Sequence, residues 1–184
     1  MASVVQAGGR RGGFGGGFGG GFGGGGRRGG GRPQRERPDD GFEQRVVELA
    51  RVTRVMGGGK RMRFRALVVV GNRQGKVGLG LAKGADVSLA VNKATTRARR
   101  ALIDVPIQHN TLPHDIMVKY KSARILLKPA PVGTGIIAGG PVRIVLELAG
   151  VPNVVSKILG SPNKINNVRA VLLAFQRLKL VKRR

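Results

Sequence analysis

An abrupt change of composition near Phe42 limits which part of this chain of 184 residues can fold. Residues 1–41 contain 18 of the 32 glycines, in imperfect repeats around Phe14, Phe18 and Phe22. Glycine loses the most backbone entropy on ordering, and this segment offers almost no apolar surface to bury in return. We therefore expect residues 1–41 to be a disordered Gly/Arg/Phe-rich N-terminal tail and residues 42–184 to hold the folded part.

Two interpretations of the tail stay open. Its arginines could lie along RNA phosphates while its phenylalanines stack on bases. It could equally be a flexible extension that keeps the protein soluble. Low-complexity composition alone does not decide between these roles.

The folded part is strongly basic. The whole chain has 34 Lys+Arg against 9 Asp+Glu, a formal net charge of +25, and residues 42–184 keep 27 basic and 6 acidic residues. Such a charge repels itself and destabilises a compact state, whereas solubility needs a net charge of only about 2–8. Lys and Arg that meet phosphates release counterions, so a nucleic acid is the favoured partner and an anionic membrane surface the weaker alternative.

Several other classes are disfavoured. The chain has no cysteine, which excludes disulfides, thiolate catalysis and cysteine zinc sites. No apolar run approaches the roughly 20 residues of a membrane-spanning helix, and the N-terminus lacks the apolar stretch of a secretory signal. We expect a protein that works where it is made, with no membrane partner.

The first folded unit is predicted to contain three strands and a helix. Arg45–Val55 fits either a strand or a short helix running into one, Arg63–Val70 ends in a β-branched run, and Lys76–Ala82 alternates. Between the first two strands, the segment from Gly57 to Met62 is predicted to be a mobile hairpin loop. In the third strand Gly78 and Gly80 share a face that something can approach closely. The helix follows Asp86, with an apolar stripe of Val87, Val91, Ala94, Ala98 and Leu102.

The second unit is predicted to have the order ββαβα. Strands are expected at Ile116–Tyr120, Ala123–Leu127 and Val151–Leu159, one helix from Pro141 to Gly150, and a last helix after Asn163. The fold class is thus α+β: a βββα unit similar to double-stranded RNA-binding domains over 42–105, then a ββαβα two-layer sandwich with a basic C-terminal tail over 106–184.

Catalysis is disfavoured by the distribution of side chains. No two of the six carboxylates in 42–184 fall on one face of a predicted element, and the two histidines, His109 and His114, lie in a connector. The segment Gly133–Gly140 precedes a helix, but Gly139-Gly140-Pro141 stand where a phosphate loop needs Gly-Lys-Ser/Thr. We expect no catalytic residue, no metal site and no cofactor, and a loop that lets another macromolecule approach.

Two basic features favour RNA. Lys60 and Arg61 beside three glycines suggest a loop that enters an RNA groove, although a plain β-turn is the alternative. On the predicted helix Lys93, Arg97 and Arg100 share a face with no acidic residue between Val87 and Ala101. That face is either merely solvated or covered by RNA, and few aromatic residues favour recognition of duplex shape.

The sequence also resembles bacterial-type small-subunit ribosomal protein five over about residues 42–178. The matching stretches are Arg51–Arg54, Ala66–Gly71, Gly75–Gly78, Lys93-Ala94, Ala98–Arg100, Gly133–Gly140, Leu148–Val151, Asn153-Val154 and Asn166–Ala170. Gly57 stands where this family often has lysine.

The resemblance implies a structural constituent of the small ribosomal subunit, in the cytoplasm or in an organelle. It implies binding to small-subunit rRNA, stabilisation of the head relative to the body, and a contribution to translational accuracy with ribosomal proteins four and twelve. Proteins four and eight would be neighbours, near the point where messenger RNA enters. A non-ribosomal RNA chaperone and an ATP-using enzyme of the same shape are the alternatives.

Two sets of candidate residues follow from the basic features and the resemblance. The rRNA-binding set is Arg51, Arg54, Gly57, Gly58, Gly59, Lys60, Arg61, Arg63, Arg73, Lys76, Lys83, Lys93, Arg97, Arg99, Arg100, Lys121 and Arg124. The protein-interface set is Gly133, Thr134, Gly135, Ile136, Ile137, Gly139, Gly140 and Arg143.

Overall fold

The computed structural model describes residues 41–180. The predictions for the Gly/Arg/Phe-rich tail and for the end of the basic C-terminal tail lie outside these residues. The described residues contain two four-stranded sheets and three helices, which confirms the α+β class.

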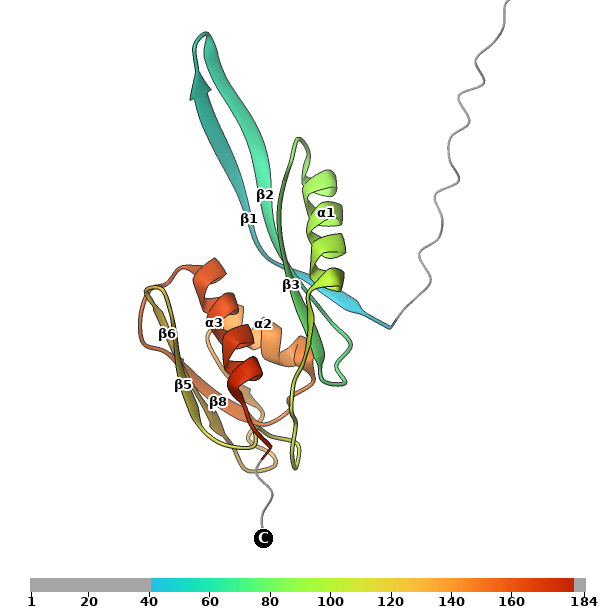
Figure 1. Cartoon of the computed structure of the whole chain (residues 1–184), viewed down its shortest axis with the longest axis vertical. Coiled ribbons are helices and arrows are strands. Elements are labelled where there is room, and N and C mark those ends of the chain that lie inside the picture. Colours follow the sequence, from blue (N-terminus) through green and yellow to red (C-terminus); the bar gives the residue numbers. More distant parts are fainter. Residues whose placement is uncertain (1–40, 181–184) are drawn as a thin grey trace, which may run out of the picture. The chain divides into compact units, whose positions relative to one another are not determined.

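The first sheet carries helix α1 (Val87–Arg100) on one face (Figure 1). Its strands are β1 (Glu43–Met56), β2 (Gly59–Gly71), β3 (Lys76–Gly84) and β4 (Leu102–Asp104), in the order β1-β2-β3-β4 with antiparallel neighbours. The ambiguous segment at its start is therefore a strand. Its register shifts between Val46 and Glu48, which explains why its apolar residues do not alternate regularly.

Helix α1 packs closely on the glycines of β3. A Cβ on Gly80 would meet the backbone of Ala94, and one on Gly84 would lie 2.6 Å from the amide nitrogen of Ala90. The predicted close approach at Gly78 and Gly80 is thus confirmed, and the approaching element is α1.

Two details of the predicted helix were wrong. Val87 is 38% exposed, and the buried residues of α1 are Ala90, Ala94, Thr95 and Ala98. Leu102 belongs to β4, because the helix ends at Arg100 and Ala101 has a non-helical φ of −117°. Leu102 pairs with Gly78, which adds a fourth strand to the predicted three.

The second sheet has the order β5-β6-β8-β7. Its strands are β5 (Ile116–Tyr120), β6 (Ala123–Pro129), β7 (Ile136–Ile137) and β8 (Val154–Ile158), with helices α2 (Gly140–Ala149) and α3 (Lys164–Arg177). The last predicted strand was too long, since regular pairing starts only at Val154. The predicted Gly-rich loop contains β7, which pairs parallel to β8.

The helix ends of this unit follow the sequence signals. Gly150 ends α2 in the left-handed conformation at φ 81°. The Asn163 side chain caps α3 by accepting hydrogen bonds from the backbone N–H groups of Ile165 and Asn166.

From Ala66 to Gly71, strand β2 is buried on both faces. Ala66, Val68 and Val70 belong to the cluster under α1, whereas Leu67 and Val69 join the core formed with α2, α3 and the second sheet. Helices α2 and α3 lie between the two sheets (Figure 1). This double burial explains the continuous apolar run in β2, which alternation alone would not produce.

Candidate nucleic-acid interface

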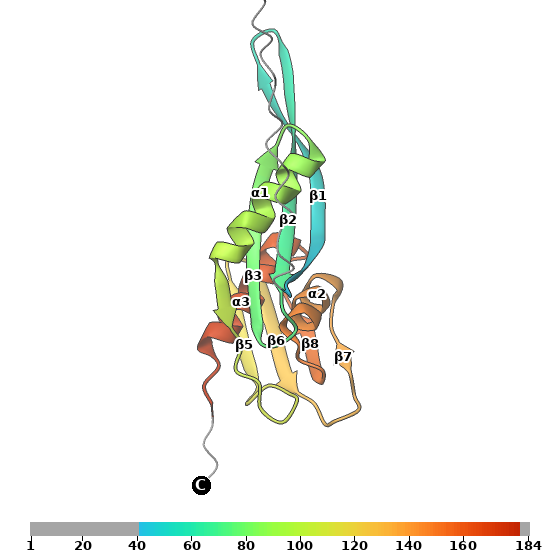
Figure 2. The same ribbon diagram turned by 90° about the vertical axis from the view of Figure 1, so that its right-hand side faces the viewer.

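The ends of β1 and β2 form a two-stranded ribbon. Pairing between β2 and β3 stops at Phe64 and Gly84, so Val52–Met56 and Gly59–Arg63 pair only with each other. Figure 2 shows these two arms extending beyond β3. The ribbon is thus a basic projection with no third strand alongside it.

A tight turn closes the ribbon. Met56 pairs with Gly59, and Gly58 and Gly59 have φ of 84° and 146°. The predicted loop over Gly57–Met62 was therefore too long, because Lys60, Arg61 and Met62 are strand residues. The glycine run is explained by the positive φ values that the turn requires.

Like charges face each other on the ribbon. Arg54 is directly opposite Arg61. The next cation on the same face, Arg63, lies opposite the uncharged Val52 and so has no acidic partner across the ribbon. Opposed like charges destabilise a sheet, and the sequence has no Asp or Glu between Leu49 and Ala85 to compensate them. The arrangement is suited to a polyanionic ligand.

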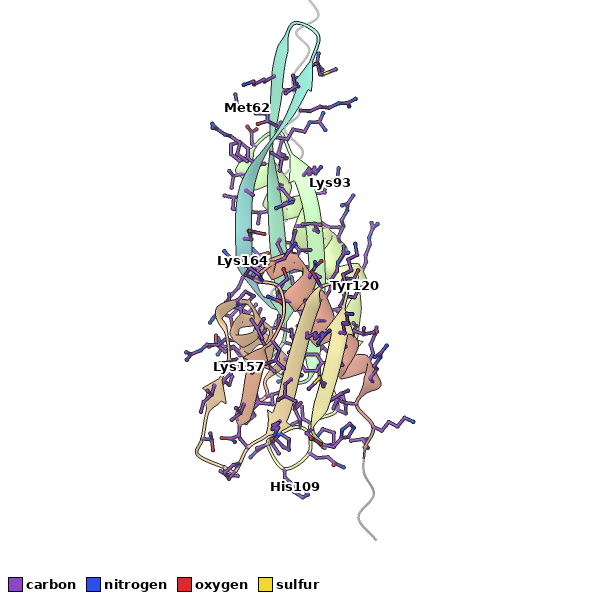
Figure 3. All side chains as sticks on the ribbon, turned by 90° about the vertical axis from the view of Figure 1, so that its left-hand side faces the viewer. Met62, Lys93, His109, Tyr120, Lys157 and Lys164 are labelled. Carbon is purple, nitrogen blue, oxygen red and sulfur yellow. The ribbon has the colours of Figure 1, made fainter. Side chains whose placement is uncertain are left out.

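Two open grooves continue from the ribbon to α1. The first has a volume of about 310 Å³ and the second about 550 Å³, and Arg63 and Lys83 line both. We call the combined surface the basic groove. Its cations are Arg54, Arg61, Arg63, Lys83 and Lys93. Figure 3 shows Met62 on the ribbon and Lys93 towards the same end of the molecule.

The basic face of α1 only partly joins this groove. Lys93, Arg97 and Arg100 are exposed, as the helical spacing predicts, but Arg97 Nη1 donates a hydrogen bond of 2.7 Å to the carbonyl oxygen of Leu81. Arg99 is half-buried. Lys93 is therefore the α1 cation that lines the groove.

Other residues of the predicted rRNA-binding set lie elsewhere. Arg51 pairs with Phe64, on the opposite face of β1 from Val52 and Arg54. Arg73 lies in the turn at the other end of β2 and β3, and Lys76 begins β3 after that turn. Lys121 and Arg124 belong to the second sheet and its β5–β6 turn. The structure thus does not bring these five cations into the groove.

An ion-pair cluster joins β1 to α2 and was not predicted. Arg45 Nη1 lies 2.6 Å from Glu147 Oε2, and Arg143 Nε lies 3.0 Å from Glu147 Oε1. Glu43 pairs with both Arg45 and Arg73. Burial raises the pKa of the Glu43 carboxyl, but hydrogen bonds from Arg73 and Arg45 outweigh this and leave its pKa below the usual value.

The turn between β2 and β3 also docks on α2. The backbone N–H groups of Arg73 and Gly75 donate to the carbonyl oxygens of Leu148 and Ala149, both at 2.9 Å. These bonds satisfy carbonyls at the end of the helix that have no partner within it. Arg73 is thus part of a junction between the two units through its backbone, while its guanidinium pairs with Glu43 in the first unit.

The predicted protein-interface segment is largely open. Gly133, Gly135 and Gly140 have no atom within 4 Å of an added Cβ, and Gly133, Ile137, Gly139, Gly140 and Arg143 are exposed. Thr134 and Ile136 are half-buried. Another backbone could approach these glycines without a clash.

Clusters of metal-ligating side chains and membrane-spanning helices are both absent from residues 41–180. No group of three or more His, Asp or Glu side chains there could hold a metal ion. None of the helices described is both long and apolar enough to cross a bilayer.

The two sheets match two models of one protein family. The model described as "Ribosomal protein S5, N-terminal domain" matches residues 42–106, and "Ribosomal protein S5, C-terminal domain" matches residues 118–183. The basic two-sheet fold is thus that of a ribosomal protein. The chain belongs to the ribosomal protein S5 family, which confirms the resemblance found in the sequence.

Relatives come from bacteria and from a plant. The chain is 49% identical to "Small ribosomal subunit protein uS5" of Thermus thermophilus over 142 residues, covering 77% of this chain and 88% of that protein. It is 49% identical to the protein of the same name from Thermosynechococcus vestitus, and the match covers 80% of this chain and 85% of that protein. It is 50% identical to "Small ribosomal subunit protein uS5c" of Spinacia oleracea over 80% of this chain, and spans about half of that relative, 48%.

Proposed function

We propose that this protein is a structural constituent of the small ribosomal subunit that binds small-subunit rRNA through the basic groove. The observation that carries the proposal is the pairing of Arg54 with Arg61 in a segment without carboxylates. Phosphates would neutralise this repulsion and release counterions. The family and the names of the relatives support the ribosomal context.

We further propose a position within the subunit, which the family resemblance supports. The ribbon would reach the rRNA between head and body and stabilise one relative to the other. The Gly133–Arg143 segment would face ribosomal protein four, near the path by which messenger RNA enters, with protein eight as a second neighbour. Through these contacts the protein would contribute to translational accuracy together with proteins four and twelve.

This role requires no catalysis by the chain itself. Glu43, Glu48 and Glu147 are held in ion pairs with arginines. Their charges are thus used to fix the fold, and the open Gly133–Gly140 segment lacks the Lys-Ser/Thr of a phosphate loop. We propose a ribosome-bound, non-enzymatic scaffold component.

Subunit occupancy tests the proposal. A tagged protein should be found once per small subunit and should remain bound at moderate salt. The double variant Arg54→Glu with Arg61→Glu should lower that occupancy, whereas Lys157→Glu, an exposed change on β8, should not. A protein that washes off and is present at far less than one copy per subunit would instead favour an RNA chaperone.

A further inference from the structure

Asn153 joins two segments that are distant in the sequence. It lies just before β8 and is 5% exposed. Its Oδ1 accepts hydrogen bonds from the backbone N–H groups of Gly133 and Gly135, at 3.0 and 3.2 Å. Its Nδ2 donates to the carbonyl oxygen of Asn110 at 3.3 Å. The side chain therefore uses its acceptor and its donor at once.

Thr111 extends this link through its hydroxyl. Thr111 Oγ1 donates to the carbonyl oxygen of Asn153 at 2.7 Å and accepts from the N–H of Ala130 at 3.1 Å. Thr111 is itself held in a short bridge with Gln108. Asn153 and Thr111 thus fix the chain on both sides of Pro131 and Val132 to the segment that precedes β8.

The backbone of the glycine segment is shaped for this contact. Gly133 and Gly135 have φ of 96° and 74°, and both of their N–H groups converge on the single Asn153 oxygen. The carbonyl of Gly135 then accepts from the N–H of Val154, where the parallel pairing of β7 with β8 begins. Because space around both glycines is open, the need for glycine comes from φ and not from crowding.

We infer that Asn153 is a positioning residue that holds Gly133–Ile137 in the conformation presented to a protein partner. The inference rests on the proposed function, in which this segment is a protein interface. An open glycine segment would otherwise lose much backbone freedom when it binds, and that loss lowers affinity. The hydrogen bonds of Asn153 order part of the glycine segment before the partner binds, so less backbone freedom is lost on binding.

The chemistry requires an amide at this position. Alanine would leave the N–H donors of Gly133 and Gly135 and the carbonyl of Asn110 without the bonds that the Asn153 side chain supplies. Aspartate would keep an acceptor for Gly133 and Gly135 but lose the donor to Asn110. The two substitutions therefore separate the contact to the glycine segment from the contact to the 108–111 turn.

Amide hydrogen exchange of the full chain, followed by NMR, tests the positioning. In Asn153→Ala, exchange at Gly133 and Gly135 should be at least about tenfold faster relative to core amides such as that of Val145. Asn153→Asp should retain more protection at both glycines than Asn153→Ala. The matched control is Asn163→Ala, which removes the α3 cap and should leave the relative protection of Gly133 and Gly135 unchanged. Equal relative protection in Asn153→Ala and Asn163→Ala would overturn the inference.

Decoding errors in cells separate this inference from the proposed function. Asn153→Ala should change misreading of a reporter about twofold or more, and Asn163→Ala should not. If the glycine segment is loosened and misreading is unchanged in Asn153→Ala, the positioning role stands and the proposed role in accuracy fails. If the exchange at Gly133 and Gly135 is unchanged, the positioning role itself fails.

Discussion

Arg54 and Arg61 lie directly opposite each other on the two arms of a ribbon that has no third strand. An isolated two-stranded ribbon is marginally stable in water, and opposed positive charges weaken it further. The free protein therefore keeps an unfavourable arrangement at its most projecting part. Binding to phosphate would remove that repulsion, so the same feature that destabilises the ribbon favours association with RNA.

The first prediction concerns the salt dependence of RNA binding. Arg61→Ala and Arg63→Ala should each weaken binding to small-subunit rRNA, because each removes a positive charge from the basic groove. The slope of log affinity against log salt should become shallower by about 0.7–0.9 for each phosphate that the variant no longer neutralises. Binding titrations at several salt concentrations measure this, with Lys157→Ala as the control. An unchanged slope would mean that these arginines are only solvated.

The second prediction concerns the contact between β3 and α1. Gly80→Ala should destabilise the fold by about 1–3 kcal/mol or more, because its Cβ would meet the backbone of Ala94, which cannot move independently. Gly57→Ala has open space and should change the free energy of unfolding by less than about 1 kcal/mol. Urea denaturation compares the two, and equal stability would contradict the packing described.

The third prediction concerns pH. The pKa of the Glu43 carboxyl is lower in the folded protein than its usual value of about 4.5. Its ion pairs therefore stabilise the fold fully at pH values above about 4.5, and this contribution is lost as pH falls through the lowered pKa. Glu43→Gln should therefore reduce the free energy of unfolding at about pH 7 and have little effect at about pH 2. Denaturation curves at both pH values test this. A difference that persists unchanged in acid would exclude ion pairing as its cause.

The fourth prediction concerns the core. Leu67→Ala should cost about 2–5 kcal/mol, because Leu67 is 1% exposed and belongs to the core shared with α2 and α3. Leu49→Ala removes a side chain of the same type that is 46% exposed, and should cost less than half as much. Thermal and chemical denaturation measure both changes. Similar destabilisation by the two substitutions would show that burial does not distinguish these leucines.

Local sequence signals predicted most of the fold. The caps at Asn163 and Gly150 marked helix ends correctly, since the groups that satisfy a helix end lie close to it in sequence. Strand β4 was missed because Leu102 also fits the helical spacing, and only pairing with Gly78 decides its state. Strand β7 was missed for a related reason, since its two residues become a strand only beside β8.

The candidate site was predicted less completely. The cations of the ribbon could be found because they are close together in the sequence. The pair of Arg45 with Glu147 spans 102 residues, and no local pattern indicates it. In the sequence, Asn153 stands out only as part of a family motif, because its role depends on where Gly133 and Gly135 direct their N–H groups.

The double burial of β2 limits how the two halves of the chain could be exchanged. One family model ends at residue 106 and the other begins at residue 118, and the unmatched segment between them suggests a natural place to cut or recombine. A fragment ending there would expose Leu67 and Val69 to water, and one beginning there would lack the surface that covers α2. The halves are therefore poor building blocks when separated. A hybrid with half of a relative should fold only if the residues facing β2 are transferred together with it.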